Sequence, residues 1–344
     1  MAATRMNEKV PLLTAWDDLL EEFRALGGTA ENICVGQGQF GRGIFPADPS
    51  RPVAIQIPHN LLVEASHMIF VNGVPRVGPA AAVGDRERAW LNRYQDQFGW
   101  GGGGGDEVNR MFEAASALPP EMRETLRTRY GLGHLFHEPD DELIQQRFFQ
   151  MRSITYQNKS VVMPIVEMVN HGGGVRYDLS QAVGLRGNFT GEVLVQYSDV
   201  DSFDYFLSWG FATERPVAFS LPLEGTLGKE RLEVGQAFNA RVTSKRNWIP
   251  EVKRNRDPVQ LTFVLLGNIQ FPRLPKGIFY QLMREGGHQG FEEAFDHIHH
   301  CNRLQFLSLL DELEGFDLAI ARSLRAMARH QLRAMSFCFG VRGL

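Results

Sequence analysis

The sequence is poor in cysteine, and the few cysteines it has are scattered. They lie at positions 34, 301 and 338, and none belongs to a C-x-x-C pair. A cysteine zinc cluster needs closely spaced thiolates, so we expect none in this chain. The scatter also fits a protein kept in a reducing compartment such as the cytoplasm.

Long apolar runs and long basic blocks are also lacking. No run approaches the ~18 apolar residues that a membrane span needs. The first residues, MAATRMNEKVPLL, lack the apolar core and cleavage pattern of a signal peptide. The net charge of −4 argues against nucleic acid as a partner. We therefore expect a cytoplasmic protein that binds neither a membrane nor nucleic acid.

The remaining composition is that of an ordinary globular protein. The chain has 344 residues, 43% hydrophobic and 22% charged, which leaves room for about two domains. Residues 14–26 have the i, i+3, i+4, i+7 apolar rhythm of an amphipathic helix that ends at Gly27-Gly28. Further helices are predicted over 84–98, from Asp106 to Pro119, over 121–130 and over 140–149, with the glycines 101–105 as a flexible break.

The stretch from Val161 to Phe211 concentrates the polar and aromatic residues that a site would need. An apolar run ends in Asn170-His171, and three glycines follow. Two strand-like pieces come next, 175–179 and 192–196, and the second delivers Tyr197. A short helix over 202–207 then leads to Trp209-Gly210-Phe211. Such groups at strand ends beside glycine are a usual way to build a site on a rigid scaffold.

A second glycine-rich stretch, 36–43, allows other interpretations. Followed by Val53-Ala54-Ile55-Gln56, it imitates a protein kinase glycine loop and its V-A-I-K strand. Gln56, however, stands where the phosphate-binding lysine belongs, and no H-R-D, D-F-G or A-P-E follows. A dinucleotide-binding loop should lead into a helix, whereas this one leads into the predicted strand 53–57.

Taken together, these motifs resemble SET-domain methyltransferases, in the branch typified by the Rubisco large-subunit lysine methyltransferase. Three family motifs lie in the 161–211 stretch: P-x-x-(D/E)-x-x-N-H, G-E-(Q/V)-x-x-x-x-Y and x-x-G-F. They are matched by Pro164, Glu167, Asn170 and His171, by Gly191, Glu192, Val193 and Tyr197, and by Gly210-Phe211. The family's G-x-G-(L/I)-x-A and I-P-x-x-L-L are matched by Gly41-Arg42-Gly43-Ile44-Phe45 and by Ile57-Pro58-His59-Asn60-Leu61-Leu62.

The resemblance implies an α+β fold with a β-rich SET core of short strands. It places the core in 12–90 and 151–215, a helical insertion in 91–150, and a mostly α-helical, substrate-binding-like domain in 216–344. In this last part we expect strands over 217–223 and 259–266. Helices should begin near 278, 291 and 316, with Leu304, Leu307, Leu310 and Leu313 in the core.

The resemblance also implies the chemistry. S-adenosyl-L-methionine is the expected cofactor and Tyr197 the expected catalytic residue. The residues expected to contact the cofactor are Gly41, Arg42, Gly43, Tyr156, Asn170, His171 and Phe211. Those expected to contact the substrate are Asn158 and Trp209. Three residues depart from the family pattern. Tyr156 replaces an arginine, Trp209 replaces a second tyrosine, and Phe203 replaces an asparagine.

The expected activity is methyl transfer to a side-chain nitrogen of a protein substrate, with lysine favoured as acceptor. Histidine is the alternative acceptor. A catalytically weak SET scaffold that binds a protein partner, or an unrelated α+β protein, also stays open. A metal site at Asp296 and His300, one helical turn apart, would need three or four convergent ligands, and no matching pair stands elsewhere in the sequence.

Overall fold

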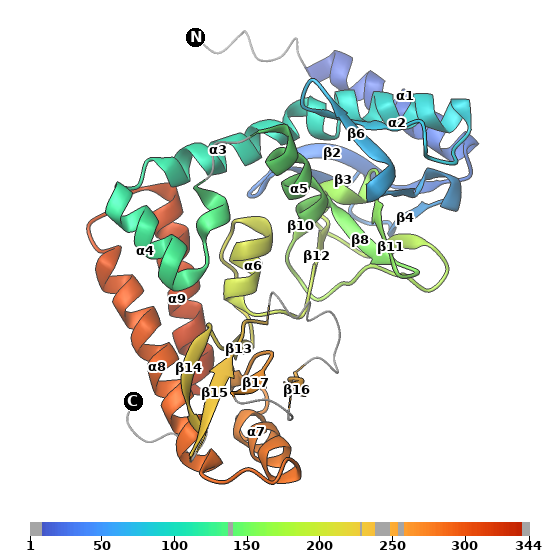
Figure 1. Ribbon diagram of the computed structural model, residues 1–344. Coiled ribbons are helices and arrows are strands. Elements are labelled where there is room, and N and C mark those ends of the chain that lie inside the picture. The colour runs from blue at the N-terminus through green and yellow to red at the C-terminus, as the bar shows by residue number, and fades with distance from the viewer. Residues whose placement is uncertain (1–8, 137–139, 228, 238–247, 254–257, 339–344) are drawn as a thin grey trace. The chain divides into compact units, whose positions relative to one another are not determined.

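The computed structural model describes residues 9–136, 140–227, 229–237, 248–253 and 258–338 (Figure 1). The chain forms two compact units, and it enters each of them twice. Unit 1 combines residues up to 110 with 139–197, and unit 2 combines 111–138 with 198–344. Short strands in small sheets alternate with helices in both units, so the expected α+β class is confirmed. The domain boundaries expected from the sequence stay predictions.

Unit 1 is built from short strands that pair in small groups. The order β1-β4-β11 gives one three-stranded sheet and β5-β9-β8 another, while β2 pairs with β3, β6 with β7 and β10 with β12. Their bounds are Thr29–Glu31 for β1, Ile33–Gly38 for β2, Gly41–Pro46 for β3, Val53–Ile57 for β4, Val63–Glu64 for β5, Met68–Val71 for β6, Val74–Val77 for β7, Ser153–Tyr156 for β8, Lys159–Val162 for β9, Asn170–His171 for β10, Val183–Gly187 for β11 and Leu194–Val195 for β12.

Helices α1 (Lys9–Ala25) and α2 (Asp85–Gln97) pack against each other through aromatic side chains. Phe23 of α1 stacks on Trp90 of α2 with ring centroids 5.3 Å apart, and both are fully buried. The Trp90 indole N–H donates to the carbonyl of Leu19 at 3.0 Å, so the one polar atom of that ring is satisfied in the core. The amphipathic pattern predicted for 14–26 is confirmed.

The glycine run after α2 is not the predicted flexible break. Trp100–Gly104 forms a π-helical turn that leads directly into α3 (Gly105–Ser116). Helix α5 (Asp141–Arg152) then returns the chain to the strands, and its Asp140 side chain accepts a hydrogen bond from the Leu143 amide at 2.8 Å. This bond caps the start of α5, because the first amides of a helix have no partner within it.

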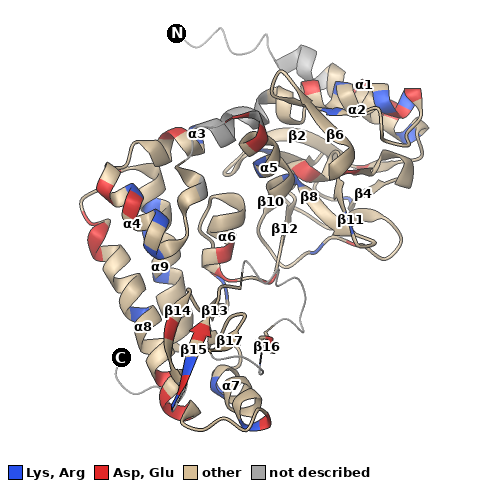
Figure 2. Cartoon of the chain, in the orientation of Figure 1, with Lys and Arg blue, Asp and Glu red and all other residues tan. Residues whose placement is uncertain are grey.

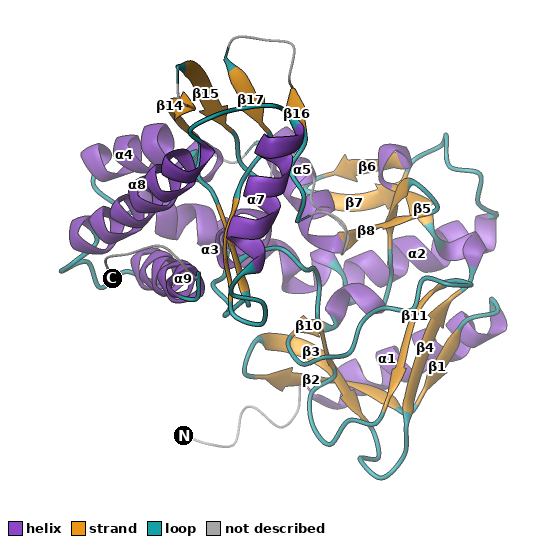
Figure 3. Cartoon of the chain, turned by 90° about the horizontal axis from the view of Figure 1, so that it is seen from below, coloured by secondary structure: helices purple, strands orange, loops and turns teal. Residues whose placement is uncertain are grey.

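Unit 2 combines a small sheet with long helices. Its strands are β13 (Val217–Phe219), β14 (Leu223–Leu227), β15 (Glu230–Val234), β16 (Val252–Lys253), β17 (Val259–Leu261) and β18 (Leu265–Asn268). Figure 3 shows β14, β15, β17 and β16 side by side in one sheet. Its helices are α4 (Pro120–Tyr130), α6 (Ser202–Trp209), α7 (Leu274–Glu285), α8 (Phe291–Glu312) and α9 (Ala319–Ser336). The helical C-terminal region was expected, and the sheet of short strands adds to it.

Charge is unequally divided between the two longest helices of unit 2 (Figure 2). Helix α9 carries Arg322, Arg325, Arg329 and Arg333, whereas α8 carries acidic residues near both ends, Glu292, Glu293, Asp311 and Glu312. The Arg325 guanidinium donates to the carbonyls of Leu313 and Phe316, at 2.6 and 2.8 Å. It thereby satisfies the carbonyl of Leu313, the residue that caps α8, and one carbonyl of the connection between α8 and α9.

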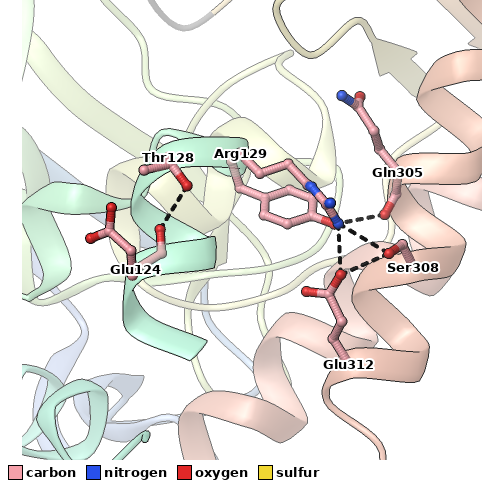
Figure 4. A network of polar contacts seen from close by, with 7 residues as sticks. Glu124, Thr128, Arg129, Gln305, Ser308 and Glu312 are labelled. Carbon is pink, nitrogen blue, oxygen red and sulfur yellow. Dashed lines mark hydrogen bonds and ion pairs between the residues drawn. The ribbon is translucent and has the colours of Figure 1, made fainter. Parts of the chain in front are cut away.

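A polar network joins α4 to α8 although the two helices are far apart in sequence (Figure 4). Arg129 donates to the Glu312 carboxylate at 2.7 Å and to the Ser308 hydroxyl at 3.1 Å. The Tyr130 hydroxyl donates to the Gln305 carbonyl at 2.8 Å, and its side chain is buried. These contacts fix α4 to α8.

Two further predictions made along the chain are wrong. Residues 175–179 form no strand; they contribute only an isolated bridge between Asp178 and Gly184. On α8, Leu304 and Leu307 are exposed, at 51% and 37%. The buried face of that helix instead carries Phe295, Ile298, His299, Asn302, Phe306 and Leu309.

Candidate ligand site at the glycine hairpin

The hairpin formed by β2 and β3 supplies the backbone of the candidate site. Gly38 is paired with Gly41 across a two-residue turn made by Gln39 and Phe40. Gly41 has φ +93°, a conformation that side-chain-bearing residues rarely adopt, so glycine is required there. Phe40 is 50% exposed at the tip of this turn.

A carboxylate lies directly against the hairpin strands. A Cβ added to Gly43 would overlap Oε1 of Glu192 and lie 2.9 Å from Nδ2 of Asn170, and a Cβ added to Gly38 would overlap Oε2 of Glu192. Glycine at both positions therefore makes room for the Glu192 side chain, which is half-buried.

Asn170 connects the hairpin to the 161–197 stretch. Its Nδ2 donates to the carbonyl oxygen of Arg42 at 3.2 Å and to Oε1 of Glu192 at 2.6 Å. The backbone holds the same elements together: β10 runs parallel to β12, with Asn170 opposite Leu194, and the Val193 amide donates to the Ile44 carbonyl at 2.8 Å. Segments more than 100 residues apart in sequence thus meet at one place.

Tyr197 lies at the end of β12, beside Asn170-His171. Its hydroxyl donates to the carbonyl of Val169 at 2.7 Å, and its amide donates to Nδ1 of His171 at 3.4 Å. The rings of Tyr197 and His171 have centroids 5.3 Å apart. The structure therefore brings together five predicted site residues, Arg42, Gly43, Asn170, His171 and Tyr197.

The Arg42 side chain points to the end of α2. Its guanidinium donates to the carbonyls of Phe98, Gly99 and Gly102 at 2.6, 3.1 and 2.6 Å. It thereby satisfies the carbonyl of Phe98, the residue that caps α2, and carbonyls of the glycine turn that follows. At the candidate site itself, Arg42 contributes its backbone carbonyl, which accepts from Asn170.

A buried polar group supports the same region from within unit 1. Glu167 is 8% exposed, and burial raises the pKa of its carboxyl above the usual range. Gln95 of α2 donates from Nε2 to Oε1 of Glu167 at 3.2 Å and accepts the Trp100 amide at 3.2 Å. Glu167, the acidic residue of the P-x-x-E match, thus ties the segment before Asn170 to α2.

Tyr156 and Asn158 lie at the β8–β9 hairpin, whose described contacts lead elsewhere. Tyr156 is buried; its hydroxyl donates to the Gln181 carbonyl at 2.9 Å and its ring lies 5.7 Å from that of His59. Asn158 is exposed and occupies the turn with φ +64°, which asparagine tolerates better than most residues. Neither residue shares a described contact with Asn170 or Tyr197, and their predicted roles stay predictions.

Trp209 and Phe211 belong to unit 2, at the end of α6. Both surround Tyr205, with ring centroids 4.7 and 5.9 Å from it, and the Arg215 guanidinium lies 5.1 Å from the same ring. Phe203 is 2% exposed, and its ring lies 6.1 Å from that of Phe306 on α8. The replacement of asparagine by Phe203 therefore fills the core of unit 2.

Glu192 is the site residue to which sequence reasoning gave no role. Its sequence signal is its place in the G-E-V match before Tyr197, and no local pattern reveals that its carboxylate meets glycines about 150 residues earlier. At the other sequence candidate, Asp296 accepts a hydrogen bond from Lys276 at 2.9 Å. In the described part of the chain no group of three or more His, Cys, Asp or Glu side chains is arranged to hold a metal.

Comparison with known proteins gives matches in structure alone. No protein-family model matches the sequence, and no curated protein matches it significantly. Among solved structures, Rubisco LSMT bound to sinefungin and monomethyllysine has 13% identity and a TM-score of 0.45, with 95% of this chain and 90% of that one covered. The SET domain of LSMT bound to lysine and AdoHcy has 13% identity and a TM-score of 0.43, with 94% and 90% covered. At this identity few side chains are shared, so what this chain does has to follow from its own residues.

None of the helices in the described ranges combines the length and the apolar character needed to cross a bilayer.

Proposed function

We propose that this protein is an S-adenosyl-L-methionine-dependent methyltransferase of the SET type. It would transfer a methyl group to a side-chain nitrogen of a protein substrate, with lysine favoured as the acceptor. The observation that carries the proposal is the meeting of three motif segments, 41–45, 164–171 and 191–197, through the side chains of Asn170 and Glu192 and the hydroxyl of Tyr197.

The residues at the hairpin suit the cofactor. Gly41 gives the hairpin its tight turn, and Gly43 lets the Glu192 carboxylate and the Asn170 amide lie directly against the hairpin backbone. Both hydrogens of the Asn170 amide are engaged by Arg42 and Glu192, which orients the amide and leaves its oxygen as an acceptor. His171, Gly41 and the Arg42 backbone are further predicted cofactor contacts in unit 1. When bound, the cofactor would supply an electrophilic methyl group on a sulfonium.

Tyr197 is the proposed catalytic residue, and its hydrogen bond indicates how it would act. Because the phenol proton is directed at the Val169 carbonyl, the oxygen can offer a lone pair to an incoming N–H group. In that role Tyr197 positions the acceptor nitrogen for in-line attack, a contribution of orientation and not of proton transfer. The same chemistry applies to a histidine acceptor, so histidine methylation is the alternative activity.

A catalytically weak scaffold that binds a protein partner is the rival from another class. It is favoured by the three departures from the family pattern: Tyr156, Trp209 and Phe203. The ring of Phe203 is packed in the core of unit 2. The scaffold hypothesis predicts cofactor binding without turnover, whereas the enzyme hypothesis predicts both.

The decisive test is calorimetric titration of S-adenosyl-L-methionine into the wild-type protein and into Asn170→Ala. Micromolar binding that is lost in Asn170→Ala would support the site, and Gln289→Ala, an amide in an exposed loop, is the matched control that should bind normally. Absence of binding to the wild type would refute the proposal.

Turnover on lysine- and histidine-containing peptide libraries, read by mass spectrometry, separates the remaining alternatives. Tyr197→Phe should retain cofactor affinity and lose about 10²-fold or more in turnover, since orienting groups contribute on this scale. Cofactor binding with no methylated product from any peptide would favour the scaffold.

A further inference from the structure

The Glu192 carboxylate carries a negative charge that no described cation neutralises. It is half-buried against Gly38 and Gly43, and it accepts one hydrogen bond, from Nδ2 of Asn170 at 2.6 Å. No Lys, Arg or His in the described ranges forms an ion pair with it. A carboxylate that is partly removed from water and has no cationic partner is costly to the folded protein.

The side-chain oxygen of Asn170, next to Glu192, also lacks a described donor. The Asn170 amide nitrogen is engaged by Arg42 and Glu192, and the side-chain oxygen of Asn170 receives no hydrogen bond from the residues that the structure describes. Two adjacent side chains thus present acceptors beside the glycine hairpin, against which Gly38 and Gly43 let the Glu192 carboxylate lie. Acceptors that lack a cationic partner are matched by a ligand that brings N–H groups and positive charge.

We infer that Glu192 recognises an ammonium group, that of the amino-acid part of the cofactor, and that the Asn170 side-chain oxygen shares this contact. The inference rests on the proposed function, because it assigns a residue to one end of the proposed cofactor. It goes beyond it by giving the glutamate that precedes Tyr197 a charge-recognition role. The rival explanation is that Glu192 only orients Asn170 and does not contact the ligand.

The substitution Glu192→Gln separates these explanations. Glutamine keeps the length of the side chain and a carbonyl oxygen that can accept from Asn170 Nδ2, so an orienting role survives. It removes the negative charge, so an ammonium loses its partner. Glu31→Gln, an exposed carboxylate on β1, is the matched control for loss of one negative charge from unit 1.

The probes are S-adenosylhomocysteine and its analogue in which hydrogen replaces the α-amino group, both measured by calorimetry at the same ionic strength. Wild type should bind S-adenosylhomocysteine at least about tenfold more tightly than the desamino analogue. Glu192→Gln should lower the affinity for S-adenosylhomocysteine by about tenfold to a hundredfold, the range for a charged hydrogen bond. Its affinity for the desamino analogue should stay within about twofold of the wild-type value. Glu31→Gln should change neither.

Each other result overturns the inference in a recognisable way. If Glu192→Gln lowered the affinity for both ligands equally, Glu192 would only orient Asn170. If it lowered neither affinity, Glu192 would have no part in binding the cofactor. Equal affinity of the wild type for both ligands would refute ammonium recognition. This comparison needs no variant, so it remains a test even if the Glu192→Gln protein fails to fold. Binding of neither ligand to the wild type would refute the proposed function, and the inference with it.

Discussion

Removing the Arg42 guanidinium tests whether this side chain clamps the hairpin to α2 or contacts the cofactor. Arg42→Met preserves most of the aliphatic stem and deletes the donors that reach the carbonyls of Phe98, Gly99 and Gly102. A hydrogen bond to a charged donor contributes roughly 1.5–3 kcal/mol. Phe98 and Gly99 are buried, whereas water can replace the donor at the partly exposed Gly102. We therefore expect unit 1 to lose about 2–4 kcal/mol of unfolding free energy.

The assay is urea denaturation, combined with hydrogen exchange of the amides of α2 to place the loss in unit 1. Arg42→Lys should lose about half as much, because one ammonium cannot reach three carbonyls in the geometry of the planar guanidinium. Arg51→Met, at an exposed position, should change stability by no more than about 0.5 kcal/mol.

If Arg42→Met proved as stable as Arg51→Met, the Arg42 side chain would not clamp the hairpin to α2. If such a stable variant also lost affinity for S-adenosyl-L-methionine, the Arg42 side chain would be a cofactor ligand. If Arg42 only clamps the hairpin, Arg42→Met should lose affinity for the cofactor only together with a loss of hydrogen-exchange protection in α2.

Two further predictions concern unit 2. Burial raises the pKa of Tyr130 to about 12, above its value near 10 in an unfolded chain, so its contribution is complete below pH 10 and is lost as the pH rises from about 10 to 12. Urea midpoints measured across that window should therefore fall more steeply for the wild type than for Tyr130→Phe, and parallel curves would contradict the assignment. Phe203→Asn, which restores the residue of the family pattern, should destabilise unit 2 by at least about 3–5 kcal/mol, because it empties a core position and buries an amide. Its denaturation midpoint in urea is the measure, and a change below about 1 kcal/mol would show that Phe203 is not a core residue.

The helices were the elements best predicted from the sequence, because their apolar period and their caps are local. The strand 53–57 and the helix beginning at Ser202 also agree with β4 and α6. By contrast, β11 at Val183–Gly187 was not predicted, since its pairing with β4 joins residues about 130 positions apart. Such pairing is decided by tertiary structure, which overrides local propensity.

Helix α8 shows how a correct helix can be given the wrong face. Leucines 304, 307, 310 and 313 recur every third residue, and a turn of an α-helix takes about 3.6 residues. Nine residues therefore rotate a side chain by about 900°, which places Leu304 and Leu313 on opposite sides of the helix. Leu313 is fully buried and Leu304 is 51% exposed. The true core face includes Asn302, whose Oδ1 accepts the Leu221 amide at 2.6 Å, a partner the sequence could not reveal.

At the candidate site, family motifs predicted which residues would gather but not what each would contact. Asn170 and Tyr197 lie together as expected, whereas the Arg42 side chain serves α2 and the Glu192 carboxylate takes the place beside the glycines. The spacing within a motif fixes residue types, but the direction of a long side chain depends on carbonyls and glycines supplied by other segments.

The double passage of the chain through both units has a consequence for its synthesis. Helix α4 leaves the ribosome long before its partner α8, since the bond from Tyr130 to the Gln305 carbonyl joins residues 175 positions apart. At roughly 5–20 residues per second, α4 waits on the order of 10 to 35 seconds for that partner. During this interval the buried side chains Met122, Leu126 and Tyr130 have no core to enter. Unit 1 is completed first, at Tyr197, and a nascent chain paused between Tyr197 and α8 would present α4 to chaperones as an exposed apolar helix.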